Sequence, residues 1–157
     1  MTEFSNTPVE ARKLWVDALR SGYYKQGKDF LCTVNVQTEE HSYCCLGVAC
    51  ELFMYHESAG ALLSRNAEDT DITEEKSAIA IRYDDTAEVA PNIVKEWLGL
   101  KNQVGGYSDE NGVDTLSKSG IKLSLATLND KGYTFEAIAD IIESPEFLAS
   151  GTAEFIS

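Results

Sequence analysis

One stripe of apolar residues near the start of the chain has the spacing of an amphipathic helix. The stripe consists of Val9, Leu14, Trp15, Ala18 and Leu19. Before it, Thr7 can cap a helix, Pro8 suits the first helical position, and Glu10 can reach back to the cap amide. Gly22 can take the left-handed conformation that ends a helix. The pattern therefore predicts a helix over residues 8–21.

Several later segments also have helical features. Residues 44–56 are apolar on nearly every face, which is typical of a central helix covered by other elements, and Gly47 within it would let a second backbone approach closely. A proline start and a glycine stop predict a short helix at 91–98. The last part of the chain predicts two helices joined by a turn and a short terminal helix, at 121–129, 134–142 and 146–156. Thr134 can cap the second of these three.

Two segments are predicted as strands. Residues 30–36 are rich in apolar and β-branched side chains and lie between polar stretches, with residues 37–42 as the exit loop. Residues 77–83 alternate with a period of two. This period puts Ile79, Ile81 and Tyr83 on one face of the strand and Arg82 on the other.

The remaining segments are predicted as loops. Residues 57–76 are acidic and rich in Asn, Asp, Thr and Ser, so we expect an exposed loop there, with a short strand at 61–64 as an option. Residues 101–120 form a second polar, glycine-containing loop. Together the elements predict an α+β fold over residues 1–157, a single compact domain in which about five helices pack on a small sheet.

Composition and charge narrow the functional classes. The apolar fraction is 43% and the charged fraction 25%, which is typical of a folded globular domain. The net charge is −13, and residues after 30 carry eight basic and twenty-two acidic side chains. This balance argues against binding to nucleic acid. Neither a signal peptide nor a stretch of about 20 apolar residues is visible, so we expect a cytoplasmic protein without a membrane span.

The four cysteines are candidates for metal ligands or for a catalytic nucleophile. The cysteines are Cys32, Cys44, Cys45 and Cys50, and the two histidines are His41 and His56. No Cys-x-x-Cys pair is present, and no catalytic set is recognisable, so buried reduced thiols are favoured over zinc or nucleophilic chemistry. Residues 108–114 lack the spacing of a calcium loop, and Asp84 with Asp85 is favoured as a solvated strand end. We therefore predict no metal, no cofactor and no enzymatic activity.

The segment from Arg20 to Lys28 is the strongest candidate for ligand binding. It is basic and bounded by glycines, and it contains two adjacent tyrosines in an otherwise acidic chain. Aromatic rings can stack on a nucleobase, and Arg or Lys can bind phosphate. The predicted ligand-binding residues are Arg20, Tyr23, Tyr24, Gln26, Lys28 and Arg82. The alternative is a solvated connector whose tyrosines cover the edge of the core.

Two motifs carry a family resemblance. Tyr43-Cys44-Cys45-Leu46-Gly47 and Leu128-Asn129-Asp130-Lys131-Gly132 occur in this order in the chain. In this respect the sequence resembles a widespread family of small uncharacterised proteins of tailed bacteriophages. The resemblance implies a phage origin, and the family has no established activity to carry over.

The resemblance and the basic segment together lead to a functional hypothesis. We expect a phage-encoded, small-molecule-binding protein that sequesters a nucleotide-derived host immune signal in the host cytoplasm without chemistry, as a homo-oligomer. The alternative hypothesis is an acidic interaction protein that binds and inhibits a host protein, since the acidic surface would suit a basic partner. A small hydrolase or transferase is a third hypothesis.

Overall fold

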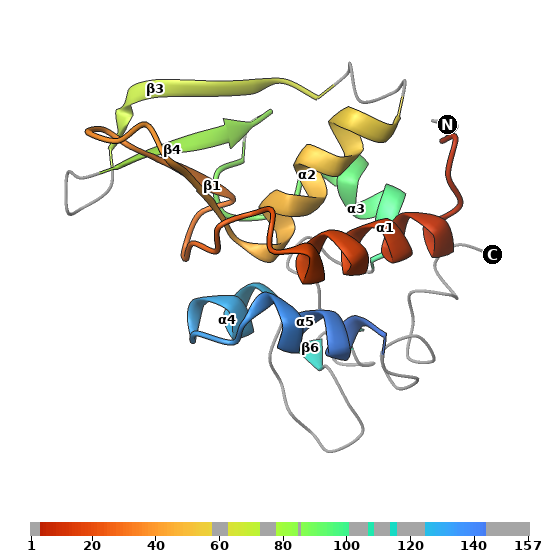
Figure 1. Cartoon of the computed structure of the whole chain (residues 1–157). Helices are drawn as coiled ribbons and strands as arrows, with labels where there is room; N and C mark the ends of the chain where they lie inside the picture. Colours follow the sequence, from red (N-terminus) through yellow and green to blue (C-terminus); the bar gives the residue numbers. More distant parts are fainter. Residues whose placement is uncertain are drawn as a thin grey trace.

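The computed structural model describes residues 4–57, 63–72, 78–84, 86–100, 107–108, 114–115 and 125–143. Its elements are α1 (Pro8–Ser21), β1 (Cys32–Asn35), β2 (His41–Tyr43), α2 (Cys45–His56), β3 (Arg65–Ile72), β4 (Ala78–Tyr83), α3 (Asn92–Leu98), β5 (Tyr107–Ser108), β6 (Asp114–Thr115), α4 (Leu125–Asp130) and α5 (Phe135–Ile142). In these ranges five helices pack with a small antiparallel sheet (Figure 1). The predicted α+β class is confirmed.

The capping signals placed most helix ends correctly. The Thr7 side chain accepts a hydrogen bond from the Glu10 amide, and the Glu10 carboxylate accepts one from the Thr7 amide. Thr134 caps α5 through the amide of Ala137. Gly22 and Gly99 end α1 and α3 with φ of 77° and 70°. The predicted terminal helix at 146–156 lies outside the described residues, as do residues 121–124 before α4.

The main sheet has the order β2-β1-β4-β3, and each neighbouring pair is antiparallel. Its two central strands are the ones that the sequence predicted. For its two outer strands the prediction was wrong. Strand β2 begins in the expected exit loop 37–42 and runs to Tyr43, and β3 lies in the expected loop 57–76. Two-residue strands β5 and β6 also pair inside the expected loop 101–120.

The composition of β3 explains why the sequence did not predict this strand. The β3 sequence is rich in Asn, Asp and Glu, which are depleted in strands, so its local preference is against a strand. Pairing with β4 nevertheless satisfies backbone groups along the open edge of that strand. The register shifts between Ala67 and Ile72, and such irregularities are common at the edge of a sheet. Of the optional strand at 61–64, residues 61 and 62 lie outside the described residues, and residues 63 and 64 precede β3, which begins at Arg65.

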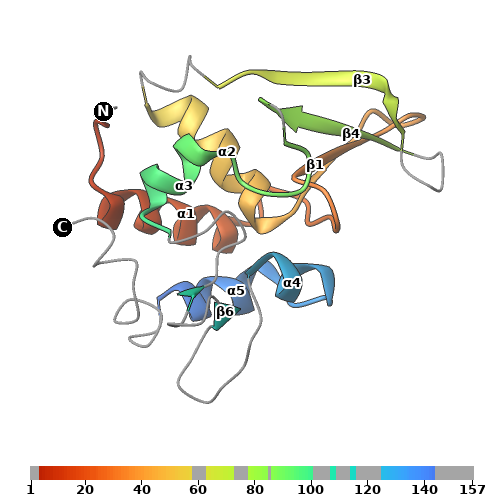
Figure 2. The ribbon, with the colours of Figure 1, turned by 180° about the vertical axis from the view of Figure 1, so that it is seen from behind.

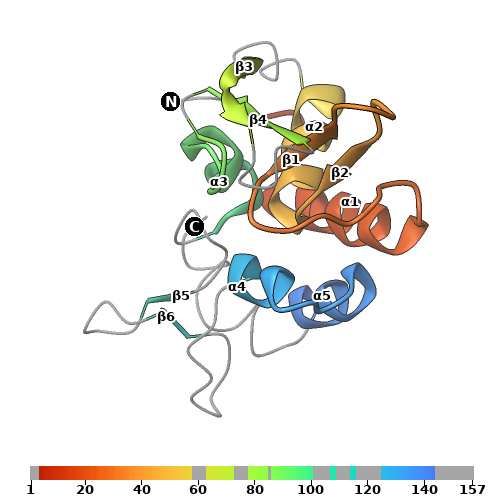
Figure 3. The ribbon, with the colours of Figure 1, turned by 90° about the vertical axis from the view of Figure 1, so that its left-hand side faces the viewer.

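Helix α1 lies at the centre of the helical part. Figures 1 and 2 show the sheet with α2 and α3 on one side of α1, and the α4–α5 hairpin on the other side. Figure 3 shows the same order from the side. The side chain of Trp15 on α1 is fully buried, and its Nε1 donates to the Cys45 carbonyl at 2.8 Å. This bond ties α1 to the first residue of α2.

A buried carboxylate attaches the N-terminal segment to the end of α2. Glu57 accepts hydrogen bonds from the amides of Ser5 and Asn6, at 2.5 and 2.9 Å, and from Trp97 Nε1 at 3.0 Å. Burial opposes ionisation of this carboxyl, but the donated hydrogen bonds outweigh it and lower the pKa of Glu57. The carboxylate therefore holds the segment before α1 and the helix α3 together.

Gly47 sets the distance between α2 and the chain that enters β1. A Cβ atom at this position would lie 1.7 Å from the carbonyl oxygen of Leu31. The predicted close backbone approach is therefore confirmed, and any side chain would force α2 away from β1.

We expect Gly47→Ala to destabilise the fold by about 1–3 kcal/mol or more, because the added methyl group collides with backbone that cannot rotate away. Urea denaturation of both proteins measures the change in the free energy of unfolding. Lys13→Ala on the exposed face of α1 serves as the control and should change it by less than about 0.5 kcal/mol. Equal stability of Gly47→Ala and the parent protein would contradict the close approach.

The four cysteines are all buried and free of disulfides, as the sequence predicted. Burial raises the pKa of Cys32 and of Cys44 to about 12, and it also raises the pKa of Cys45 and Cys50. The thiolate is therefore scarce at neutral pH, and these side chains act as small core residues.

The folded protein should react very slowly with iodoacetamide at pH 8, where a thiol with a pKa near 12 is only about one ten-thousandth thiolate. In denaturant all four thiols should be alkylated within minutes, because they return to ordinary thiol pKa values. Intact mass spectrometry counts the adducts. Rapid stoichiometric labelling of one cysteine in the native protein would show that this thiol is reactive and accessible.

Candidate functional site

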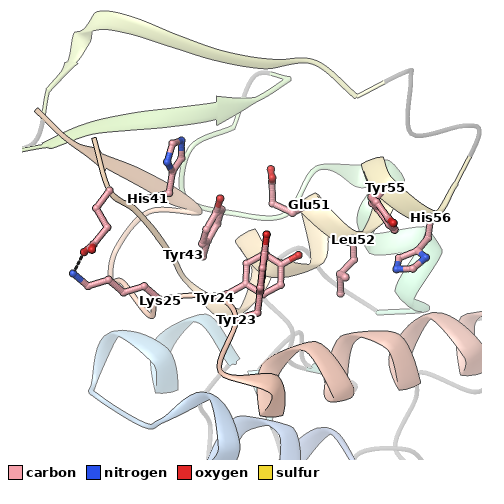
Figure 4. A pocket seen from close by; sticks show the side chains of 10 residues that line it. Tyr23, Tyr24, Lys25, His41, Tyr43, Glu51, Leu52, Tyr55 and His56 are labelled. Atoms are coloured by element: carbon pink, nitrogen blue, oxygen red, sulfur yellow. Dashed lines mark hydrogen bonds and ion pairs between the residues drawn. The ribbon is translucent and has the colours of Figure 1, made fainter. Parts of the chain in front are cut away.

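An open pocket of about 770 Å³ lies between the loop after α1, strand β2 and the C-terminal half of α2 (Figure 4). Ten residues line it: Tyr23, Tyr24, Lys25, Glu40, His41, Tyr43, Glu51, Leu52, Tyr55 and His56. The volume falls within the range of small-molecule sites, which is roughly 300–1,000 Å³. The pocket is therefore large enough for a nucleotide-sized ligand.

Aromatic rings dominate the pocket, and both histidines of the chain are among them. A continuous row runs from His41 through Tyr43 and Tyr24 to Tyr23, with successive ring centroids 6.3, 5.3 and 5.0 Å apart. A second pair, Tyr55 with His56, has a centroid distance of 4.8 Å. Figure 4 shows Glu51 and Leu52 between the row and this pair.

The loop after α1 is held against β2 by backbone hydrogen bonds. The Tyr43 amide donates to the Lys25 carbonyl at 2.8 Å, and the Gly27 amide donates to the Tyr43 carbonyl at 2.6 Å. A Cβ atom on Gly27 would lie 2.9 Å from the Cβ of Ser42, so glycine permits this close contact. These bonds place the Tyr24 ring edge-on against the Tyr43 ring.

Gln26 and Asn129 link the same loop to the α4–α5 hairpin. Gln26 Nε2 donates to Asn129 Oδ1 and to the Tyr133 carbonyl, and Gln26 Oε1 accepts from the Phe135 amide. Asn129 Oδ1 also accepts from the Cys45 amide at 3.2 Å, and its Nδ2 donates to the Gly27 carbonyl at 2.8 Å. The side chain of Gln26 is therefore used as a brace between elements.

The structure does not gather the six predicted ligand-binding residues into one site. Tyr23 and Tyr24 line the pocket, whereas the other four do not. Arg20 forms ion pairs with Asp140 of α5 and with Glu143, the residue that caps the end of α5.

The last two predicted residues lie elsewhere. Lys28 is exposed, and its Nζ lies 3.8 Å from the position that a Cβ of Gly132 would take. Arg82 is half-buried on β4, in register with Asn66 of β3.

The Lys and Glu side chains that line the pocket already have protein partners. Arg65 Nη1 donates to both carboxylate oxygens of Glu51, at 2.7 and 2.9 Å, and the Tyr83 hydroxyl donates to one of them at 2.7 Å. Lys25 forms an ion pair with Glu40 (Figure 4). Both carboxylates that line the pocket are thus neutralised by a basic side chain.

The hydroxyls of Tyr24, Tyr43 and Tyr83 remain protonated at neutral pH. Burial raises the pKa of Tyr24 and of Tyr43, and it raises the pKa of Tyr83 most strongly. Nearby negative charge on Glu51 adds to each shift. Each hydroxyl can therefore donate a hydrogen bond as well as accept one.

Sequence reasoning missed the part of the pocket built by β2 and α2. The sequence placed His41 in a loop and Tyr43 just before a helix, so no pocket wall was expected there. A usable signal existed in α2, where Glu51 and Tyr55 are four residues apart and therefore on one side of a helix that is otherwise apolar. A polar and an aromatic residue on the same side of an otherwise apolar helix indicate that this side is exposed to solvent and not covered by the core.

Within the described ranges, no group of three or more His, Cys, Asp or Glu side chains is arranged to hold a metal ion. Among the helices that the structure describes, none is long and apolar enough to cross a membrane.

Comparison with known proteins places the pocket inside a defined domain. A family model described as a domain of unknown function (DUF8296) matches residues 8–146, a range that includes every residue lining the pocket. No curated protein and no solved structure is significantly similar to the chain. Because the match covers most of its 157 residues, the chain belongs to the DUF8296 family.

Proposed function

We propose that this protein binds a planar, nucleotide-derived small molecule in the tyrosine-lined pocket and holds it without chemical change. The observation that carries the proposal is the row of rings from His41 to Tyr23 beside an open volume of about 770 Å³. Every nucleobase has a π face, and stacking on an aromatic side chain contributes about 1–3 kcal/mol per base. Tyrosine hydroxyls and backbone groups around the rings can add hydrogen bonds.

Several features favour binding over turnover. The carboxylate of Glu51 is engaged by Arg65 and Tyr83, so it is a poor candidate for a general base. None of the four cysteines lines the pocket, and burial keeps their thiols protonated. An aromatic site whose two carboxylates are already paired suits retention of a ligand.

The biological setting of the proposal comes from the sequence resemblance. A phage protein that retains a host nucleotide signal in the cytoplasm of the infected cell would prevent that signal from reaching its receptor. Sequestration requires no turnover, but it requires affinity and abundance. We propose a homo-oligomer as the working assembly, and light scattering after size-exclusion chromatography measures it directly.

The net charge of −13 supports a second candidate function. An acidic surface steers a basic partner toward it and rejects acidic partners, so the chain would inhibit a host protein that carries a basic surface. In this case the exposed tyrosines at the pocket would be interface residues, since tyrosine is enriched in protein interfaces.

Tyr23→Ala and Tyr55→Ala should each weaken ligand binding by about 1–3 kcal/mol without changing the melting temperature of the free protein. The reason is that these rings line the pocket while 83% and 84% of their surface is exposed, so folding does not depend on them. A thermal-shift screen of nucleosides, cyclic nucleotides, dinucleotides and ADP-ribose derivatives selects the ligand, and calorimetry measures the loss.

Tyr133→Ala is the matched control, because Tyr133 is also exposed but lies outside the pocket lining. A ligand at 100 times its Kd should add about 2.7 kcal/mol of stability to the parent protein. Chromatography of the ligand released by heating should recover it unaltered. Altered ligand would indicate an enzyme, and no shift with any compound would remove the support for ligand binding.

If the second candidate is correct, the tagged protein should retain a specific host protein at low salt and lose it at about 0.5 M salt, because screening shortens the range of charge attraction. Quantitative mass spectrometry of both eluates measures the difference. An unrelated protein of similar size and net charge is the control for nonspecific capture. A partner that is retained equally at both salt concentrations would contradict an electrostatic interaction.

A further inference from the structure

The rings around the pocket present surfaces that attract positive charge. Four of the seven tyrosines of the chain line it. The face of a tyrosine ring carries partial negative charge, so a cation placed over it is attracted. Tyr23 and Tyr55 stand at the rim with most of their surface exposed, and their faces are therefore open to a ligand.

The helices beside the pocket add negative potential. Helix α1 ends at Ser21, and Tyr23 follows its cap Gly22 directly. Helix α2 ends with Tyr55 and His56, which are both lining residues. Two helices thus bring their carboxyl ends to the pocket, and the carboxyl end of a helix carries about half a negative charge. Phosphate sites use the opposite end, where amide groups point outward.

The basic side chains near the pocket are already paired with carboxylates. Lys25 pairs with Glu40, and Arg65 pairs with Glu51. Within the described lining, Lys25 is the one Lys or Arg side chain. A phosphate would have to break such a pair and would approach a protein with a net charge of −13.

We infer that the group bound in this pocket is a planar nitrogen heterocycle with a positive charge, such as an N-alkylated pyridinium or an N-methylated purine. Phosphate groups, where the ligand carries them, remain outside in solvent. The inference rests on the proposed function, since it names the chemical class of ligand for the same site. The tyrosine faces and the two helix carboxyl ends supply the selectivity for a cation. The Lys25–Glu40 and Arg65–Glu51 pairs are each neutral in sum, so they do not oppose this selectivity.

The test compares ligands that share a shape and differ in charge. The probes are 1-methylnicotinamide against nicotinamide, and 7-methylguanosine, measured at mildly acidic pH, against guanosine. We expect each cation to bind roughly tenfold tighter than its neutral counterpart, which is the effect of one partly desolvated contact between a cation and an aromatic face. A 5′-phosphate on 7-methylguanosine should leave the affinity equal or weaker. Calorimetry with the full chain measures all five compounds.

A double variant separates charge recognition from simple apolar contact. Tyr23→Leu with Tyr55→Leu keeps apolar side chains at the rim but removes two aromatic faces. All five compounds should bind more weakly because they lose stacking on these rings, and the preference for the cation should fall to about threefold or less. Tyr133→Leu is the control and should keep the full preference.

The outcomes distinguish this inference from the function on which it rests. Equal or tighter binding of the neutral compounds, or tighter binding of the phosphorylated one, would overturn the inference and leave the proposed ligand binding intact. A cation preference that persists in the double variant would overturn the assignment of selectivity to the rings. Failure of every compound to bind would overturn the inference and would count against the proposed function as well.

Discussion

The buried side chain of Asn129 is the interaction on which the arrangement of the helices and the pocket depends. Its Oδ1 accepts hydrogen bonds from the Cys45 amide and from Gln26, and its Nδ2 donates to the Gly27 carbonyl. The residue is fully buried, so each unsatisfied group would cost about 1–3 kcal/mol. One amide therefore fixes three segments relative to each other: the loop after α1, the start of α2 and the α4–α5 hairpin.

The hydrogen bond between the Cys45 amide and Asn129 Oδ1 explains why the chain contains the two sequence motifs, because it joins one motif to the other. Asn129 belongs to the Leu-Asn-Asp-Lys-Gly turn and Cys45 to the Tyr-Cys-Cys-Leu-Gly segment, and the two meet in the core although 84 residues separate them. Gly47, in the Tyr-Cys-Cys-Leu-Gly motif, lets α2 lie against the Leu31 carbonyl. Because α2 carries Glu51 and Tyr55, both motifs act on the pocket indirectly, through the position of the helix that forms one of its walls.

The sequence predicted local structure well and long-range structure poorly, for a physical reason. Helix ends depend on neighbouring residues such as Thr7 and Gly22, so they could be read from the chain. Strand β3 depends on a partner strand, and its own composition is against it. Likewise, the tyrosines after α1 were identified from their chemistry, but the partner of Gln26 lies 103 residues away, so its structural role could not be seen.

Pairing of the basic residues explains why the proposed binding mode relies on aromatic rings. With 26 acidic and 13 basic side chains, a basic residue on this surface meets a carboxylate readily. Arg20, Lys25 and Arg65 are each bound to carboxylates in this way. Such residues hold elements together and are not available to a ligand without the loss of that contact. If the pocket binds a ligand as proposed, recognition would fall to uncharged groups, and in this pocket those are mainly the tyrosine rings.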